Sequence, residues 1–281
     1  LVVSDGEKSS DPSTARVVAD RGADHRVGPG RTLETPSAVA AIARDGEVIT
    51  IDAWSYEGDV AVWRANNLTI HGIGGYAHIV GDGSTSAQGK GLWVVQGSNT
   101  TIENVEFSRA KVTDRNGAGI RAEGAGLTLR KCSFHDNENG ILAANNAASS
   151  ILIEHSSFRN NGYGDGKTHN LYVNRVDRLT ILFSSFVGAK VGHQVKSRAK
   201  HTTLMYNRML DLEEGNSSYG IDLPNGGLCV VVGNQVHQGP RALNTGLVAF
   251  AAEGAIHPTN ELYFAHKTLV NERASGTFVR V

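Results

Sequence analysis

Short apolar segments recur along most of this chain at a spacing that decides its fold class. Each segment alternates apolar and polar residues and is followed, two or three residues later, by phenylalanine or another apolar anchor. Alternation of this kind is typical of strands with one buried face. No helical stretch separates the strands, as a βαβ repeat would require. The anchors are 23 to 33 residues apart and fall at Phe107, Phe134, Phe158, Phe186, Met209, Val236 and Leu269.

The repeat predicts an all-β fold, a single-stranded right-handed parallel β-helix in which each coil of a solenoid contributes three short strands. Gly and Asn recur between the strands, where corners need residues that tolerate positive φ. Asn104, Asn207 and Asn234 take similar places in their repeats. We expect their amides to form a ladder that satisfies backbone groups inside a turn.

The residues before the regular repeats predict a helical cap. Thr35 suits the N-cap of a helix and Pro36 its first position, so we expect a short helix over about 35–45 that covers the first exposed coil. Residues 1–28 are polar and aperiodic, which predicts an N-terminal arm. The β-helix domain then spans 29–281, with coils from about residue 60.

At the other end, residues 277–281 read as a strand in the middle of a coil. We expect a truncation, an aggregation-prone edge or pairing with a second copy, so a homo-oligomer through this uncapped coil is one prediction.

Composition narrows the classes of partner. The chain has 33 Gly, 40% hydrophobic residues, and 27 basic against 28 acidic residues, for a net charge of −1. This balance gives no reason to expect nucleic acid or a membrane as partner. No apolar run approaches the roughly 18 residues that span a bilayer, and the apolar start at residues 1–3 is too short for the core of a signal peptide.

The two cysteines are predicted to be free. The repeat places Cys132 and Cys229 four coils apart, or roughly 19 Å at about 4.8 Å per coil. A disulfide needs Cα atoms within about 7 Å. We therefore expect two buried thiols, which say little about the redox compartment.

A second strand in each coil can be phased from its apolar residues, and this phasing places polar residues on one outward face. The residues taken to point inward are Ile120, Ile141, Leu171, Val195, Ile221 and Leu247. One outward row is then Arg121, Leu142, Tyr172, Lys196, Asp222 and Val248, and a parallel row is Glu123, Ala144, Asn174, Arg198, Pro224 and Phe250.

Three adjacent coils of these rows concentrate the groups that can do chemistry. A phenol, an ammonium, a guanidinium and a carboxylate meet there, and two imidazoles begin the same strands. The candidate catalytic residues are Lys196, Arg198, Tyr172, His169, His193 and Asp222, and the candidate substrate-binding residues are Asn174, Tyr219, Arg121 and Glu123.

Each member also has a structural interpretation. The contact of Lys196 with Asp222 can be a surface ion pair worth about 0 to 1 kcal/mol. The two histidines can be corner residues bonded to backbone carbonyls. The concentration of these types on three coils, between coils with bland residues, favours function.

Acidic loops flank this face and can wall a groove over it. They carry Glu253, His257 and Glu261 after Phe250, and Asp211, Glu213 and Glu214 after Met209. Calcium is an alternative at such carboxylates, but no loop shows regular ligand spacing. We therefore predict no cofactor and assign no metal ligand.

The segment from Lys196-Ser197 through Tyr206-Asn207 to Asp222-Leu-Pro-Asn-Gly226 and Gly233-Asn234 resembles the β-helix polysaccharide lyases. It is most similar to the chondroitinase B and alginate lyase group, family six. The resemblance is specific over about 192–236 and covers 67–270 as generic repeats. It implies that Lys196 is the base that removes the proton beside a uronate carboxylate.

The chain departs from that group at two places. The group's catalytic arginine lies in the next coil, where this chain has Asp222 or Leu223. Its Ca²⁺ ligands precede the lysine, where this chain has residues 192–194, Gly-His-Gln. The segment His169-Asn-Leu-Tyr172 also resembles bacterial secreted β-helix proteins. The resemblance thus implies a secreted or periplasmic protein with an acidic polysaccharide as partner.

The leading hypothesis is a polysaccharide lyase that cleaves a uronic-acid polymer by β-elimination. Lys196 is the base, Arg198 with Asn174 holds the substrate carboxylate, and Tyr172 or His169 is the acid. A uronan C5-epimerase shares the first half of this reaction. A glycoside hydrolase with Asp222 as acid needs a second carboxylate within roughly 5 to 9.5 Å. A non-catalytic carbohydrate-binding or surface β-helix is the alternative outside enzymes, since fold does not imply function.

Overall fold

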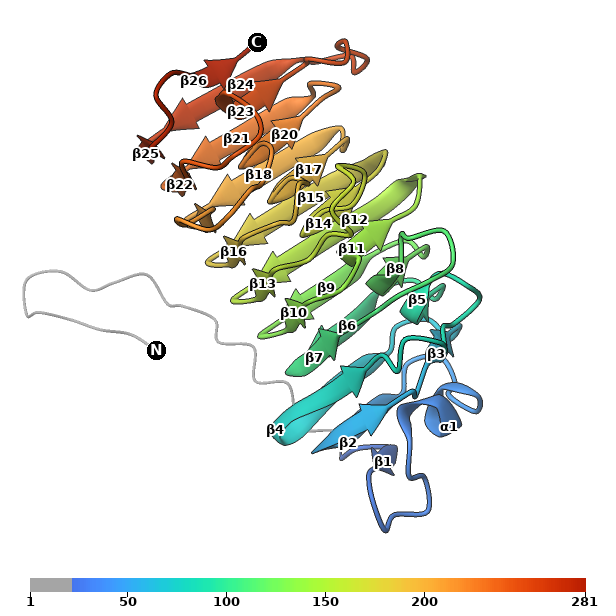
Figure 1. Cartoon of the computed structure of the whole chain (residues 1–281). Helices are drawn as coiled ribbons and strands as arrows, with labels where there is room; N and C mark the ends of the chain where they lie inside the picture. Colours follow the sequence, from blue (N-terminus) through green and yellow to red (C-terminus); the bar gives the residue numbers. More distant parts are fainter. Residues whose placement is uncertain (1–21) are drawn as a thin grey trace, which may run out of the picture.

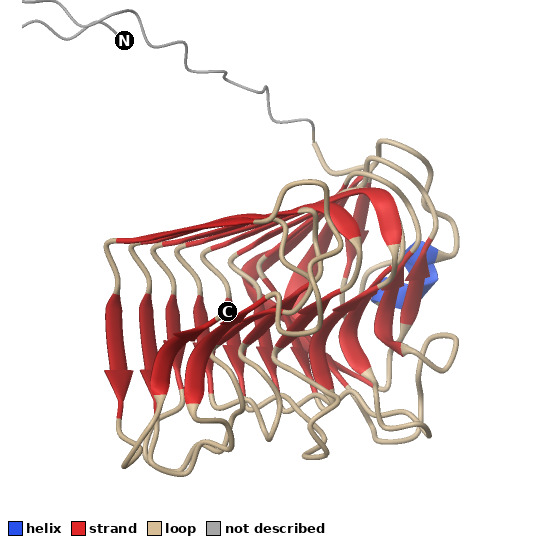
Figure 2. Ribbon diagram, turned by 90° about the horizontal axis from the view of Figure 1, so that it is seen from above, coloured by secondary structure: helices blue, strands red, loops and turns tan. Residues whose placement is uncertain are grey.

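The computed structural model describes residues 22–281, which form a right-handed parallel β-solenoid of about nine turns with almost no helix (Figure 1). The predicted fold class is confirmed. Figure 2 shows the coils stacked side by side, with each strand lying beside its counterpart in the next coil. All strand pairings in the two sheets are parallel.

Each regular coil contributes one strand to each of three columns. Two columns merge into one sheet of 17 strands and the third forms a sheet of nine. The first column contains β1 (His25–Val27), β2 (Val48–Glu57), β4 (Thr69–Val80), β6 (Thr100–Glu103), β9 (Leu127–Arg130), β12 (Asn146–Glu154), β15 (Val176–Leu182), β18 (His201–Met205), β21 (Leu228–Val232) and β24 (Glu261–Ala265). The second column contains β7 (Val105–Ser108), β10 (Ser133–His135), β13 (Ser157–Arg159), β16 (Ser185–Val187), β19 (Arg208–Leu210), β22 (Gln235–Gln238) and β25 (Thr268–Asn271).

The nine-stranded sheet is the third column and carries the predicted outward rows. Its strands are β3 (Ala61–Trp63), β5 (Gly91–Val95), β8 (Ala118–Ala122), β11 (Asn139–Ala143), β14 (Leu171–Val173), β17 (Val195–Ser197), β20 (Ile221–Leu223), β23 (Gly246–Phe250) and β26 (Thr277–Arg280).

The N-terminal cap is present but short. The helix α1 spans Pro36–Ala40, and the Thr35 side chain accepts a hydrogen bond from the Ala38 N–H, as expected for an N-cap. Most of the predicted arm, residues 1–21, lies outside the described residues. Its last part forms β1, which pairs with β2. Parallel pairing therefore begins well before residue 60, where we expected the coils to begin.

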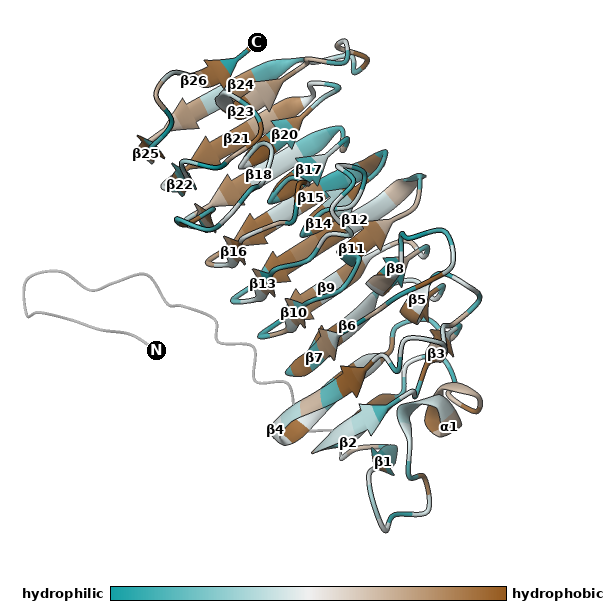
Figure 3. Ribbon diagram, in the orientation of Figure 1, coloured by the Kyte–Doolittle hydropathy of each residue, from teal (hydrophilic) through white to brown (hydrophobic). Residues whose placement is uncertain are grey.

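The core is a continuous column of apolar side chains along the solenoid axis. Apolar positions repeat on successive strands (Figure 3). The predicted anchors stack in register: the rings of Phe107 and Phe134 lie 5.0 Å apart, those of Phe134 and Phe158 4.8 Å, and those of Phe158 and Phe186 4.6 Å. Each of these four rings is fully buried. In these four coils one buried aromatic ring per coil stacks on the next, at the spacing of the paired strands.

A ladder of side chains satisfies backbone groups at the turn before several of the anchors. Asn207 donates from Nδ2 to the side-chain oxygen of Asn234 and to the Ile181 carbonyl, as predicted. Ser184 continues the ladder by donating its N–H to Asn207. The prediction for Asn104 is wrong by one residue, because Val105 occupies the ladder position. Asn104 instead has φ +55° and donates to the Gly72 and Gly75 carbonyls.

Residues in the left-handed conformation occupy one corner of successive coils, each three residues before an anchor. Their φ angles lie between +49° and +70°. They are Asn104, Lys131, His155, Phe183, Tyr206, Gly233 and His266. Three of them form an external stack: the Phe183 ring lies 5.2 Å from the His155 ring and 5.5 Å from the Tyr206 ring. We call this the left-handed corner.

Both cysteines are free and buried, as predicted. Burial raises the pKa of each thiol to about 12, so both stay protonated. Among residues 22–281, no helix is long and apolar enough to cross a membrane.

Candidate functional site

Three neighbouring strands of the nine-stranded sheet, β14, β17 and β20, form the candidate site. Tyr172 pairs with Lys196, and Lys196 pairs with Asp222, so the three side chains form one row across three coils. Their predicted phase is therefore correct. These residues alternate with buried Leu171, Val195 and Ile221, and this alternation turns the row outward.

The phase fails in the next coil. Val248 pairs with Ile221, and Ala249 pairs with Asp222, one residue away from the predicted register. All five residues of β23 are apolar and buried, so the sequence holds no alternation from which to read a phase. Val248 belongs to the core rather than to the outward row.

The centre of the site is a buried ion pair. Lys196 Nζ lies 3.0 Å from Asp222 Oδ2, and His193 Nε2 lies 3.3 Å from the same oxygen. The side chains of Lys196 and Asp222 are 11% and 5% exposed, so this pair is not the weak surface pair of the alternative interpretation. Burial raises the pKa of Asp222, although the charge and hydrogen bond of Lys196 oppose the shift. A buried carboxyl with this preference can take up a proton.

The two histidines stack beside this pair, with ring centroids 4.7 Å apart. His169 Nδ1 accepts the N–H of His193, and His193 Nδ1 accepts the N–H of Tyr219. They therefore accept from backbone N–H groups and do not donate to backbone carbonyls as the structural interpretation expected. Each Nδ1 lacks a proton, so the neutral rings carry it on Nε2, and His193 presents Nε2–H to Asp222.

Burial keeps both imidazoles neutral. It lowers the pKa of His193 to about 3, and the charges of Lys196 and Arg198 add to this effect. Burial likewise lowers the pKa of His169 well below its usual value, with a further contribution from His193. Neither ring carries a charge at neutral pH. They act as hydrogen-bonding and stacking groups that support the ion pair.

We expect these histidines to make stability depend on pH. The unfolded chain protonates His193 below about pH 6.5, whereas the folded chain resists protonation down to about 3. The contribution of His193 to the free energy of unfolding is thus complete above pH 6.5 and is lost as pH falls. His193→Gln should therefore lose less stability than wild type between about pH 7 and pH 5, as measured by urea unfolding. Exposed His266→Gln is the matched control, and equal losses in wild type and His193→Gln would contradict this assignment.

Arg198 connects the row to two loops. Its Nε donates to the Tyr172 hydroxyl at 2.9 Å, and its Nη1 donates to Asn225 Oδ1 at 2.6 Å. Its Nη2 donates to Glu253 Oε2 at 2.7 Å. Asn225 lies in the turn after β20, and Glu253 lies in the loop after β23. The guanidinium is thereby fixed at three points, with the phenol of Tyr172 on one side.

The carboxylate of Glu253 bridges the two cations. Its Oε1 lies 3.4 Å from Lys196 Nζ while Oε2 contacts Arg198. Its partial burial opposes ionisation, but the hydrogen bond from Arg198 and the two positive charges lower the pKa of Glu253 overall. Half of this side chain is exposed. The site therefore holds a carboxylate with a lowered pKa at its solvent side and a carboxylate with a raised pKa at its base.

Comparison with known proteins agrees with this architecture. The family model for the right-handed β-helix region matches residues 40–261. The chain belongs to the right-handed β-helix family.

Two solved β-helix structures are similar to this chain over most of its length. The alignment with pectate lyase Pel9A has a TM-score of 0.64 at 13% sequence identity. It covers 92% of this chain and 78% of the lyase chain. The alignment with the deglycosylated pectin methylesterase from Aspergillus niger has a TM-score of 0.61 at 12% sequence identity. It covers 91% of this chain and 88% of the esterase chain. At these identities the likeness concerns the fold alone. No curated protein matches the sequence.

Not every predicted residue of this β-helix protein reaches the cluster. Asn174 donates to the Ala143 carbonyl and thus supports the backbone corner. Tyr219 stacks on His193, with ring centroids 5.3 Å apart. Arg121 lies near Glu123, whose carboxylate binds Lys90 at 2.6 Å. The strand of Arg121, β8, is separated from β14 by β11, so this pair stands apart from Lys196.

Of the acidic residues in the two predicted flanking loops, only some contact the site. Glu253 reaches the site, whereas Glu261 belongs to β24 and pairs with Leu228. In the acidic loop after Met209, Asp211 accepts the Ser217 N–H, and Glu214 binds Arg241. The first bond closes the loop on itself and the second ties it to the loop after β22, so neither carboxylate contacts the Lys196 cluster.

Sequence reasoning missed Asn225 as a member of the site. Its signal was the turn Pro224-Asn225-Gly226 directly after Asp222, one coil beyond Arg198. A side chain at such a turn can reach back over the preceding coil, as Asn225 does here.

Proposed function

We propose that the cluster around Lys196 is the active site of a polysaccharide lyase that cleaves a uronic-acid polymer by β-elimination. One observation carries the proposal: the Glu253 carboxylate lies between Lys196 Nζ and Arg198 Nη2. This arrangement is the environment that the carboxylate of a bound uronate requires. On substrate binding, the uronate carboxylate replaces that of Glu253 on Arg198, which is suited to planar carboxylate recognition.

Elimination needs a base at C5, and Lys196 fills this role once it is neutral. Its Nζ lies 3.0 Å from Asp222 Oδ2, so this carboxyl, whose pKa burial raises, is placed to accept the proton that the amine must lose. The neutral amine then takes the C5 proton of the substrate. The electron pair forms the C4–C5 double bond while the C4–O bond breaks, and Arg198 stabilises the negative charge that develops on the uronate carboxylate.

The leaving oxygen needs a proton, and Tyr172 is placed to donate it. The phenol lies in the same row as Lys196, and its oxygen accepts a hydrogen bond from Arg198 Nε. This guanidinium stabilises the phenolate that forms when the proton leaves. His169 is the weaker candidate for the acid, because it is buried and its Nδ1 is engaged by the His193 N–H.

Three further points support the substrate class. The Lys-Ser, Tyr-Asn and Asp-Leu-Pro-Asn-Gly segments are similar to the family six lyases. The two similar solved structures are named for pectate and pectin. Strands in one column are about 4.8 Å apart, so an extended polymer can lie across several coils. We therefore propose an acidic polysaccharide as partner and a secreted or periplasmic location, where such polymers occur.

The test is incubation with pectate, alginate and glycosaminoglycans while the ultraviolet absorbance of the unsaturated uronate product is followed. A rise on one polymer supports the lyase. No rise in absorbance with any of these polymers contradicts the lyase proposal. NMR of the recovered polymer then shows whether C5-epimerisation took place instead.

A glycoside hydrolase is the second candidate, because Glu253 supplies the second carboxylate that the outward rows lacked. Asp222 Oδ2 and Glu253 Oε1 contact the same nitrogen at 3.0 Å and 3.4 Å, so they lie at most about 6.4 Å apart, the sum of the two contacts. Burial raises the pKa of Asp222, and the Arg198 hydrogen bond lowers that of Glu253. Two carboxyl groups at this separation, with their pKa values shifted in opposite directions, suit glycoside hydrolysis.

Glu253→Gln separates the two candidates. In the lyase, the variant removes the internal carboxylate that competes with substrate, and KM should fall by about three- to tenfold. In the hydrolase, the same variant removes a catalytic group, and kcat should fall by at least about a hundredfold. Steady-state kinetics on the polymer identified by the panel gives the answer. Glu261→Gln, which changes a carboxylate outside the cluster, should leave both constants unchanged.

A further inference from the structure

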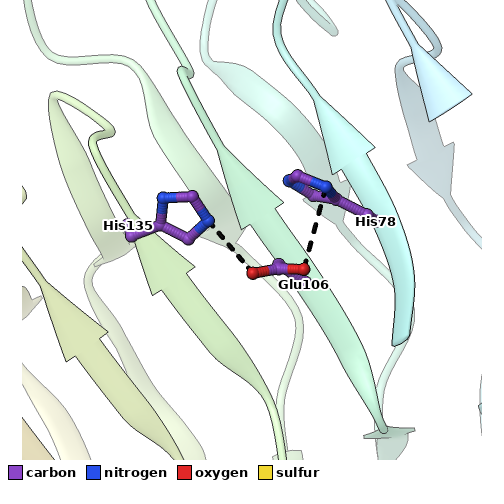
Figure 4. A group of neighbouring side chains, drawn as sticks. All are labelled: His78, Glu106 and His135. Carbon is purple, nitrogen blue, oxygen red and sulfur yellow. Dashed lines mark hydrogen bonds and ion pairs between the residues drawn. The ribbon is translucent and has the colours of Figure 1, made fainter. Parts of the chain in front are cut away.

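A second cluster of ionisable side chains lies on the first turns of the solenoid, far along the chain from Lys196. It contains His78 on β4, Glu106 on β7 and His135 on β10 (Figure 4). These strands are neighbours in three successive coils, and His78 pairs directly with Glu106. All three side chains point outward from one sheet, and each is about a quarter exposed.

The ligand atoms of these residues converge. His135 Nε2 lies 3.0 Å from Glu106 Oε1, and His78 Nδ1 lies 3.7 Å from Glu106 Oε2. One ligand atom from each of the three residues lies within 4.8 Å of the other two. A tetrahedral Zn²⁺ with bonds of about 2.0 to 2.2 Å places its ligand atoms about 3.3 Å apart. Small side-chain rotations therefore suffice to bring all three to one ion.

The outer nitrogen of each imidazole has a hydrogen-bond partner of its own. His135 Nδ1 lies 2.9 Å from Asp136 Oδ2, and His78 Nε2 lies 2.8 Å from Ser108 Oγ. If each outer nitrogen carries the proton, the inner nitrogens, Nε2 of His135 and Nδ1 of His78, present lone pairs to the space beside Glu106. A carboxylate or hydroxyl behind a ligating histidine is the usual way in which a protein orients a metal ligand.

We propose that His78, Glu106 and His135 bind a Zn²⁺ ion. Two imidazoles and one carboxylate suit zinc, whereas Ca²⁺ and Mg²⁺ prefer oxygen ligands throughout. The three ligands come from strands of three coils, so the ion fastens these coils together. The site lies on the 17-stranded sheet and Lys196 on the nine-stranded one, so the inference is independent of the proposed function.

Three protein ligands leave a fourth position of the ion open. A surface depression begins at Glu106 and His135 and continues over Ser133, Asp136 and Arg159. Water or an anionic ligand can reach the ion from this depression, with Arg159 at its side. Other histidine–carboxylate pairs of the described chain, such as His71 with Glu103 at 3.3 Å, bring together only one imidazole and one carboxylate.

The experiment is titration of the chelator-treated, untagged full chain with ZnCl₂ in a calorimeter. We expect one equivalent to bind. The ligand variants His78→Ala, Glu106→Gln and His135→Ala should each weaken zinc binding by at least about tenfold. Asp136→Asn changes the residue that orients His135, and it should also weaken binding by about tenfold or more. His71→Ala, the matched histidine from the neighbouring His–Glu pair, should bind as wild type does. Absence of saturable binding, or equal weakening by His71→Ala, overturns the proposal.

Thermal unfolding gives a second readout that does not depend on the heat of binding. Zinc at a hundredfold excess over Kd should raise the Tm of wild type by roughly 5 °C. The Tm of Glu106→Gln should rise by no more than about half as much, because its binding is at least about tenfold weaker. Its unfolding curve without metal shows that the variant is folded. A wild-type Tm that zinc leaves unchanged, or an equal rise in both proteins, overturns the idea that one ion fastens three coils.

Discussion

Lys196→Ala is expected to abolish turnover of the acidic polysaccharide, with a fall in kcat of about 10³-fold or more. The variant removes the base from the row formed by Tyr172 and Asp222. It leaves Arg198 with its bonds to Tyr172 and Glu253, so the substrate carboxylate still has a cation to bind. The loss should therefore appear in kcat, with KM changed far less. A non-catalytic carbohydrate-binding protein would show a change in affinity alone.

Three controls keep this result interpretable. Lys200→Ala removes an exposed lysine four residues along the chain and should leave the rate unchanged. Circular dichroism establishes that Lys196→Ala is folded, which matters because the variant leaves buried Asp222 without its cation. Added methylamine should restore part of the rate, as expected if the missing group is an amine. A variant that turns over as fast as wild type would remove Lys196 from the mechanism.

Phe134→Ala is expected to cost about 3 to 5 kcal/mol of the free energy of unfolding. Phe134 lies in the middle of the internal stack, fully buried between Phe107 and Phe158. Its removal leaves a cavity between two coils that cannot collapse easily, because the backbone ladders on either side fix the coil spacing. Urea unfolding followed by circular dichroism measures the loss as a shift of the transition midpoint.

Phe183→Ala is the matched control for this change. Phe183 also stacks in register with neighbours, His155 and Tyr206, but on the outside of the solenoid and 51% exposed. Its truncation should cost less than about 1 kcal/mol. Equal losses from Phe134→Ala and Phe183→Ala would mean that burial does not decide the value of a stacked ring in this protein.

The fold was readable from the sequence because one physical constraint repeats in every coil. An inward anchor must fill the axis at each turn, so Phe107, Phe134, Phe158 and Phe186 recur at coil length. The roles of individual polar residues at the corners were harder to predict. Asparagine suits both the ladder position, where Asn207 lies, and the left-handed corner, where Asn104 lies, and residue type alone does not separate two neighbouring positions with the same preference.

In the candidate site too, the residues on regular strands were predictable and the residues in loops were not. Alternation on β14, β17 and β20 was sufficient to predict the row of Tyr172, Lys196 and Asp222. The five buried apolar residues of β23 carry no such alternation, and the register there was predicted wrongly. The bridging geometry of Glu253 depends on a loop conformation that no periodic pattern encodes. The zinc ligands escaped notice because 28 and 29 residues separate His78, Glu106 and His135, and only the coil length brings them together.

The left-handed corner has a consequence for how this protein tolerates change. The backbone there keeps the same conformation whether it carries Asn104, Lys131, Phe183 or Tyr206. Apart from Asn104, which bonds to the Gly72 and Gly75 carbonyls, these side chains are exposed, so the core does not restrict their identity. The corner thus offers a row of largely exchangeable positions, one per coil, at the spacing that the parallel strand pairing sets. Side chains introduced at this corner by substitution would be displayed at regular intervals along the solenoid axis.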